Sequence, residues 1–223
     1  MPITRVGLIE QIDQASSTTH AYTVGASGVS QGSFVVLRCG TVNAGRTMTG
    51  VVDSKGNTYT LDVNDSTTVA FIASGYISTA LVNGDTITVT IDVAATFMGD
   101  AVEYTGIVSS GALDQTKTNS NGVSTSWTTT ATAPTTQADE LCVAMARHGA
   151  DIRSTPEGTW TEESDFRAAT TGRSMVTQYK IVSATGAYSG DGTWDSATGS
   201  TASIATYRGG STPITGLRPA ICL

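Results

Sequence analysis

The sequence has little charge. Only 14% of its 223 residues are charged, against about a quarter in an average globular domain. Lysine occurs only at Lys55, Lys117 and Lys180. So few lysines and glutamates exclude a long charged helix or coiled coil. The net charge of −7 argues against nucleic acid as a partner, because the phosphate backbone would meet a negative surface.

Long apolar runs and paired cysteines are also missing. No stretch approaches the 18 consecutive apolar residues that would predict a membrane span, so we expect no membrane partner. At the N-terminus, Glu10 and Asp13 interrupt any secretory signal. The cysteines, Cys39, Cys142 and Cys222, match no metal template or disulfide framework. We expect Cys39 and Cys142 to be buried thiols, and the protein to fold in a reducing host cytoplasm.

The sequence is instead rich in threonine (39), serine (23) and glycine (24). Runs with alternating polar and apolar residues recur between turn residues, which is typical of β-strands. The expected strands cover residues 34–39, 48–53, 58–63, 69–77, 86–93, 97–107, 125–132, 140–148, 159–166, 174–183 and 200–208. Residues 140–148 also have helical propensity, but turn residues on both sides favour a strand.

These strands predict an all-β fold, a jelly-roll-like antiparallel β-sandwich over residues 14–208. A division into two domains near residue 110 is the alternative. Alternation places Tyr59, Leu61 and Val63 on one face of their strand. In the clearest alternating run, the side chains expected to point inward are Ile87, Val89, Ile91 and Val93.

The two ends of the chain are expected to be extended arms, residues 1–13 and 209–223. Pro213 and Pro219 prevent a regular strand throughout the C-terminal segment, because proline lacks the backbone donor. That segment is more apolar than a free tail usually is. We therefore predict a partner-binding arm, with contacts through Ile214, Leu217, Ile221 and Leu223.

No constellation for catalysis stands out. His20 lies in a polar segment, and His148 ends an apolar run, where it is expected to be a structural polar residue. The loop at Asp53–Asn57 and the residues 62–65 resemble the oxygen-rich loops that bind calcium, but a β-turn explains the same residue types. We therefore assign no catalytic, cofactor-binding or metal-binding residue, no cofactor, and no enzymatic activity.

Tryptophans are the residues that a sugar-binding surface would use. Trp127, Trp160 and Trp194 each lie among Thr, Ser and Gly, where packing at the rim of the sandwich is the alternative role. The segment around Trp194, DGTWD, is the most loop-like of the three. Trp194 is therefore our candidate surface contact.

Several segments resemble a β-sandwich module that recurs in tailed-phage virion proteins and in bacterial surface proteins. They are VVDSKGNTYTL (51–61), AVEYTGI (101–107), LDQT (113–116), STSWTTT (124–130), TTQADELCVAMA (135–146) and GTW (192–194). The resemblance implies a scaffold or surface role and brings no catalytic residues with it.

Without a signal peptide, the chain is most similar to a phage head decoration (cement) protein. That resemblance implies a trimer on the outer capsid surface of the virion that binds the major capsid protein and stabilises the shell. Two alternatives stay open, a tail or baseplate component and a carbohydrate-binding adhesion module.

Overall fold

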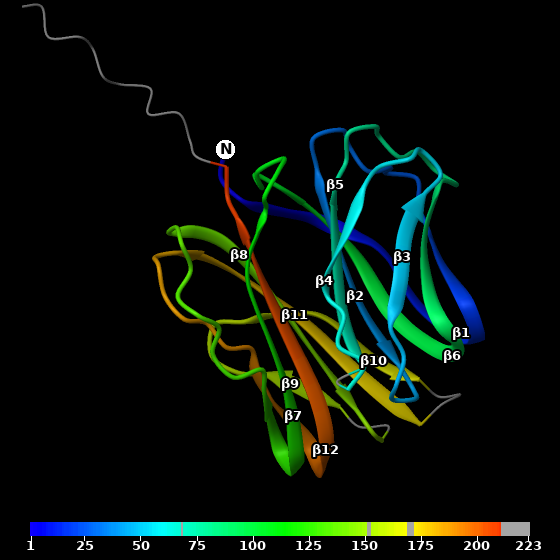
Figure 1. Ribbon diagram of the computed structural model, residues 1–223. Helices are drawn as coiled ribbons and strands as arrows, with labels where there is room; N and C mark the ends of the chain where they lie inside the picture. The colour runs from blue at the N-terminus through cyan, green and yellow to red at the C-terminus, as the bar shows by residue number, and fades with distance from the viewer. Residues whose placement is uncertain (68, 151–152, 169–171, 211–223) are drawn as a thin grey trace, which may run out of the picture.

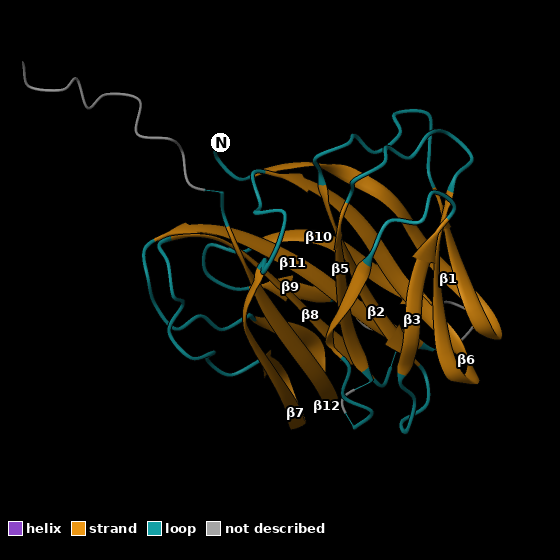
Figure 2. Ribbon diagram, turned by 45° about the horizontal axis from the view of Figure 1, so that its top comes forward, coloured by secondary structure: helices purple, strands orange, loops and turns teal. Residues whose placement is uncertain are grey.

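The computed structural model describes residues 1–67, 69–150, 153–168 and 172–210, and in these residues it contains strands and no helix (Figure 2). The twelve strands are β1 (Thr4–Thr23), β2 (Phe34–Thr41), β3 (Met48–Asp53), β4 (Tyr59–Val63), β5 (Ala70–Tyr76), β6 (Thr86–Thr105), β7 (Leu113–Thr128), β8 (Asp139–His148), β9 (Ser154–Pro156), β10 (Thr161–Ala168), β11 (Arg173–Ser183) and β12 (Asp191–Arg208). The described part of the chain accordingly has no helix that is long and apolar enough to cross a membrane. The expected antiparallel β-sandwich is confirmed.

Each half of the chain builds one sheet (Figure 1). The first sheet has the order β1-β6-β2-β5-β4, with β3 also paired to β6. The second sheet has the order β7-β12-β8-β11-β10, with β9 also paired to β12. Adding six to each strand number of the first sheet gives the strand order of the second sheet. The molecule therefore contains two copies of a six-stranded structural repeat. The chain passes from one sheet to the other between β6 and β7.

The strand registers align the two repeats residue by residue. In the first repeat, Tyr104 of β6 lies opposite Phe34 of β2, and in the second, Tyr207 of β12 lies opposite Leu141 of β8. The edge strands β4 and β10 each carry a register shift at the same place, at Asp62 and at Glu163. Both the regular ladder and its irregularity are thus repeated.

Three apolar clusters hold this arrangement together. The inter-sheet core lies between the sheets and includes Phe34, Val36, Val143 and Tyr207. The first sheet also has an outer core, because the long strand β6 pairs with β3 through its first half and with β2 through its second half. The smaller outer core of the second sheet consists of Trp127, Ala146, Val176, Trp194 and Ala202. With apolar clusters on both faces, β2 is buried along its whole length, which explains its continuous apolar sequence.

A buried ion pair of the first sheet is hydrogen-bonded to the second sheet. Arg38 of β2 donates from Nε and Nη2 to the two carboxylate oxygens of Asp100 on β6, at 2.9 Å each, and both side chains are fully buried. From the second sheet, the Thr177 hydroxyl donates to Asp100 at 2.6 Å, and the Gln178 carbonyl accepts from Arg38 at 3.2 Å. The hydrogen bonds from Thr177 and to Gln178 thus link this pair to the second sheet across the inter-sheet core.

Three expectations need correction. Residues 4–13 are not an arm but the first half of β1, paired with β6; bulges at Arg5/Gly7 and Leu8/Glu10 interrupt the alternation that would have marked a strand. Val63 faces the inter-sheet core, away from Leu61, because the bulge between them changes its face. Val93 is exposed, since the pairing of β3 with β6 ends at Ile91.

Candidate functional site

Trp194 is not a surface contact. It lies inside β12 and is 4% exposed. Its ring centroid is 6.1 Å from that of Trp127 and 4.6 Å from that of His148. The run DGTWD continues the strand, so alternation turns the indole into the outer core of the second sheet. The role in core packing is the correct one for Trp194 and Trp127.

The four C-terminal contact residues, Ile214, Leu217, Ile221 and Leu223, lie outside the described residues, as does Cys222. Cys39 and Cys142 are buried free thiols, as expected. Burial raises the pKa of each to about 12, which keeps them in the unreactive thiol form at neutral pH.

The two histidines are buried structural residues. His20 stacks on Phe97 with a centroid distance of 4.3 Å, and its Nε2 is 3.0 Å from the carbonyl oxygen of Ser17. His148 accepts a hydrogen bond from the backbone N–H of Ala150 at 2.9 Å. Burial lowers the pKa of both rings, which favours the neutral form.

The oxygen-rich loop at Asp53 is a turn. One carboxylate oxygen of Asp53 accepts backbone hydrogen bonds from Lys55 at 2.9 Å and Asn57 at 3.1 Å. The other accepts from the Asn57 amide at 2.8 Å and from the Tyr59 hydroxyl at 2.9 Å. These bonds use the carboxylate to close the loop on itself. Among the described residues, no group of three or more His, Cys, Asp or Glu side chains is placed to hold a metal ion.

A recess with a mixed polar and apolar lining lies where the described chain ends. It has a volume of about 340 Å³ and is lined by residues of the N-terminus, of β11 and of Gly209 and Gly210. Two large apolar side chains of its lining are exposed, Met1 at 66% and Ile181 at 44%. In Figure 1 the N-terminus and the end of β12 meet at the same corner of the molecule. Exposed apolar side chains therefore gather at the place from which residues 211–223 continue.

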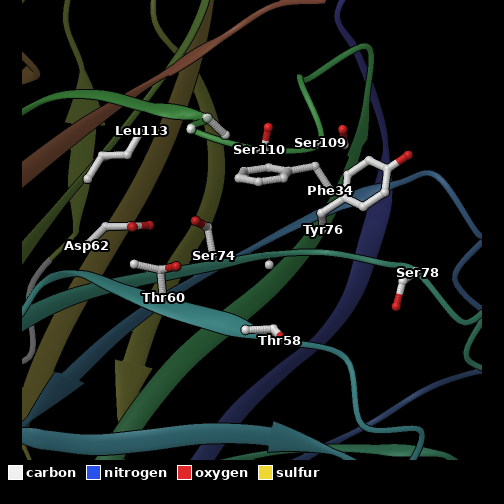
Figure 3. A pocket seen from close by; sticks show the side chains of 13 residues that line it. Phe34, Thr58, Thr60, Asp62, Ser74, Tyr76, Ser78, Ser109, Ser110 and Leu113 are labelled. Carbon is white, nitrogen blue, oxygen red and sulfur yellow. The ribbon is translucent and has the colours of Figure 1, made fainter.

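A second cavity, of about 440 Å³, lies between β4, β5 and the connection from β6 to β7 (Figure 3). We call it the Asp62 cavity. In Figure 3, Thr60 and Asp62 of β4 face Leu113 and the serines of the connection across it. Its hydroxyl-bearing side chains are Thr58, Thr60, Ser74, Tyr76, Ser78, Ser109 and Ser110, and Phe34 adds a second aromatic ring.

Asp62 is the acidic group of this cavity. Its Oδ2 accepts a hydrogen bond from the Tyr207 hydroxyl at 2.7 Å, whereas its buried Oδ1 has no well-aligned donor among the described residues. Burial raises the pKa of this carboxyl to about 6, although the hydroxyls of Ser74 and Tyr207 act in the opposite direction. No ion-pair partner lies near it in the described part of the chain.

From the sequence, Asp62 stood out only as one of the oxygen-rich residues 62–65, which a β-turn explains equally well and to which no site was assigned. The available signal was an internal repeat: NTYTLD (57–62) aligns with GTWTEE (158–163), so that Tyr59 corresponds to Trp160 and Asp62 to Glu163. Six residues of types that are common in strands do not by themselves indicate a repeat. The similarity becomes significant only together with the repeated sheet order.

Comparison with known proteins gives no relative. No protein-family model matches the chain, and neither a curated protein nor a solved structure matches it.

Proposed function

We propose that this chain is a structural protein of a phage virion, and that it decorates the outer head surface and stabilises the shell by binding the major capsid protein. In this proposal it acts without catalysis, as a homotrimer whose C-terminal segment, residues 209–223, binds a neighbouring subunit. A ligand that binds only the assembled shell stabilises it by mass action.

The apolar corner of the molecule is the observation that carries this proposal. Met1 and Ile181 expose apolar surface around a recess, beside the point where the apolar C-terminal segment begins. Exposed apolar side chains gathered at one place are typical of an interaction site. The neighbouring subunit is therefore expected to bind here, together with the segment that carries Leu217 and Ile221.

The edge strand β1 is a second support. It pairs only with β6 among the described strands, so the outer edge of its first half can pair with another strand. Near its end, the side chains of Gln14 and Glu10 bond the carbonyl of Ala21 and the N–H of Thr23. Val6 and Leu8 on β1 are 51% and 42% exposed. A strand added to such an edge gains backbone hydrogen bonds and apolar contacts together.

Truncation after Gly210 tests the proposal. The full chain should have three times the 22.9 kDa mass of one chain in light scattering, and it should bind heads from which the protein has been stripped. The truncated chain should keep its β-sheet circular dichroism but be a monomer that no longer binds heads.

Matched substitutions in the full chain separate side-chain contacts from chain length. Ile214→Ser with Leu217→Ser should reproduce the truncation, whereas Thr215→Ser, in the same segment, should behave as the unmodified chain. Normal head binding by the truncated chain would exclude the proposed arm. Electron microscopy of gold-labelled protein on whole virions separates the head from the alternative location, the tail or baseplate.

A carbohydrate-binding module is the second candidate, and the Asp62 cavity favours it, since aromatic rings and hydroxyls line the same space. A glycan array with the unmodified protein and with Tyr76→Ala tests it. Signals that Tyr76→Ala abolishes would support sugar binding, and an array without signals above background would exclude it.

A further inference from the structure

The structural repeat provides an internal comparison for the Asp62 cavity. At the bulge of β4, Asp62 binds the Tyr207 hydroxyl of the other repeat. At the equivalent bulge of β10, Glu163 binds Arg5 instead, with a distance of 2.7 Å from Nε to Oε2. Both acids therefore reach across to the opposite repeat, and in one case the partner is a guanidinium cation.

The strand registers show why the two sites differ. Arg5 lies opposite Tyr104 in the pairing of β1 with β6, and Leu113 lies opposite Tyr207 in the pairing of β7 with β12. Leu113 is thus the equivalent of Arg5. Where the second site has an arginine, the first site has a shorter apolar side chain without charge.

A second difference enlarges the space. Gln178 of β11 pairs with the residue before the bulge of β10, and Ala73 of β5 pairs with the residue before the bulge of β4. Gln178 and Ala73 are thus equivalent. The next residue is Tyr179 in β11 and Ser74 in β5. Tyr179 is therefore the equivalent of Ser74. The Tyr179 ring packs on Tyr104 at a centroid distance of 6.0 Å, so that in the second site side chains occupy the space that is a cavity in the first.

The exposure of the two acids agrees with this difference. The Glu163 side chain is 2% exposed and is sealed by its ion pair. Asp62 lines an open cavity and retains an oxygen without a well-aligned donor. A carboxylate in such a place lacks a counter-charge, and charges in low-dielectric surroundings need one.

We propose that the Asp62 cavity is a binding site for a guanidinium or alkylammonium cation, which takes the position that Arg5 holds in the other repeat. The cationic head donates hydrogen bonds to the Asp62 carboxylate, and its carbon chain lies along Leu113 and Phe34. The hydroxyls of Thr60 and Ser74 accept its remaining N–H groups. The cation is either a free small molecule or the side chain of a partner polypeptide.

Titration calorimetry with argininamide at pH 8 tests this site. We expect saturable binding to the unmodified protein, with at least tenfold weaker binding of citrullinamide, which has the same shape but no charge on its head group. Asp62→Asn should weaken argininamide binding about tenfold or more, since hydrogen bonds to charged groups contribute about 1.5–3 kcal/mol. Asn can still accept the Tyr207 hydrogen bond, and a thermal melt establishes that the variant folds.

Leu113→Arg is the decisive variant, because it builds into the first site the cation that the second site already has. It should raise the melting temperature and abolish argininamide binding, whereas Leu113→Met should bind like the unmodified protein. If Leu113→Arg still binds argininamide, or if the unmodified protein binds argininamide and citrullinamide equally, the proposal is wrong.

Acid should weaken the binding. Asp62 and Tyr76 are the titratable residues of the described cavity lining, and Tyr207 is the further titratable group bonded to Asp62. Burial raises the pKa of the Asp62 carboxyl to about 6, so Asp62 gains a proton as the pH falls through this value. Affinity for argininamide should therefore fall as the pH is lowered through 6, and an affinity that does not fall there would overturn the assignment to Asp62.

The peptide acetyl-Gly-Arg-Gly-amide distinguishes the two sources of the cation. If it binds as tightly as argininamide, the site admits an arginine side chain of a polypeptide. If only argininamide binds, the cavity admits a free cation. Binding of neither compound overturns the proposal.

Discussion

At the scale of single residues, Glu140 is the most informative ionisable group. Its side chain is fully buried at the start of β8. Burial, together with the neighbouring Asp114, raises the pKa of Glu140 to about 7. Asp114 is bound by Arg208 Nη2 and by the Thr136 N–H, at 2.6 Å each. The proton therefore belongs on Glu140, and the negative charge on Asp114.

Glu140→Gln tests this arrangement. The folded protein holds the Glu140 proton up to about pH 7, whereas the unfolded chain loses it near 4.5. Stability should therefore fall as pH rises through this window. Gln has a similar shape but does not ionise. The variant should therefore be more stable than the unmodified protein by about 1–2 kcal/mol at pH 8 and equally stable at pH 4. Urea unfolding at both pH values measures the difference. An equal increase in the free energy of unfolding at both would contradict the prediction.

The buried cysteines give a second prediction at this scale. Cys39 and Cys142 are buried, with pKa values raised to about 12. In a Cys222→Ser background, the native protein should therefore react with none of its thiols at pH 8 within minutes, and with both after unfolding in guanidinium. Dithionitrobenzoate absorbance counts them, and a fast reaction of the native variant would show that a core strand opens.

At the scale of elements, the edge strands show the limit of sequence reasoning. The range of β4 was predicted to within one residue, because TYTLDV alternates cleanly. Its bulge was not predicted, since a single extra residue leaves the alternation of residue types almost unchanged. The bulge decides where Asp62 lies, so the strand was predictable from the sequence and the Asp62 cavity was not.

The ion pair between Arg38 and Asp100 gives the prediction at this scale. Asp100→Ala should destabilise the protein by about 3–5 kcal/mol, because it leaves a buried guanidinium without its partner. The triple variant Arg38→Met, Asp100→Leu, Thr177→Val removes every member of the side-chain network and should recover most of that loss. Chemical denaturation measures both. A triple variant as unstable as Asp100→Ala would mean that the pair itself, rather than the unpaired charge, determines stability.

At the scale of the whole molecule, the all-β class followed from threonine, glycine and the alternating runs. The repeat did not follow, because its two copies share a sheet order and a few positions, such as Tyr104 and Tyr207, without an evident sequence period. The pairing of β1 also required the structure. Its partner, β6, is about 80 residues away in the chain, and no local pattern specifies such a pairing.

The two sheets should unfold together, although each has its own outer core. The inter-sheet core draws apolar side chains from both repeats, and separating the sheets would expose these side chains together with the buried ion pair. Neither sheet alone can exclude water from its inner face. Calorimetry should therefore give one transition, with equal calorimetric and van't Hoff enthalpies.

Matched substitutions make this prediction sharp. Val36→Ala and Val143→Ala change equivalent positions of the inter-sheet core, while Leu37→Ala and Val176→Ala change the outer cores of the first and second sheets. Each should lower the same single transition, by about 4–8 °C for a loss near 2 kcal/mol. Two transitions, one shifted only by Leu37→Ala and the other only by Val176→Ala, would show that each repeat folds as a separate domain. A single transition that responds to all four means that the repeat is one cooperative unit, held together by contacts that neither half makes alone.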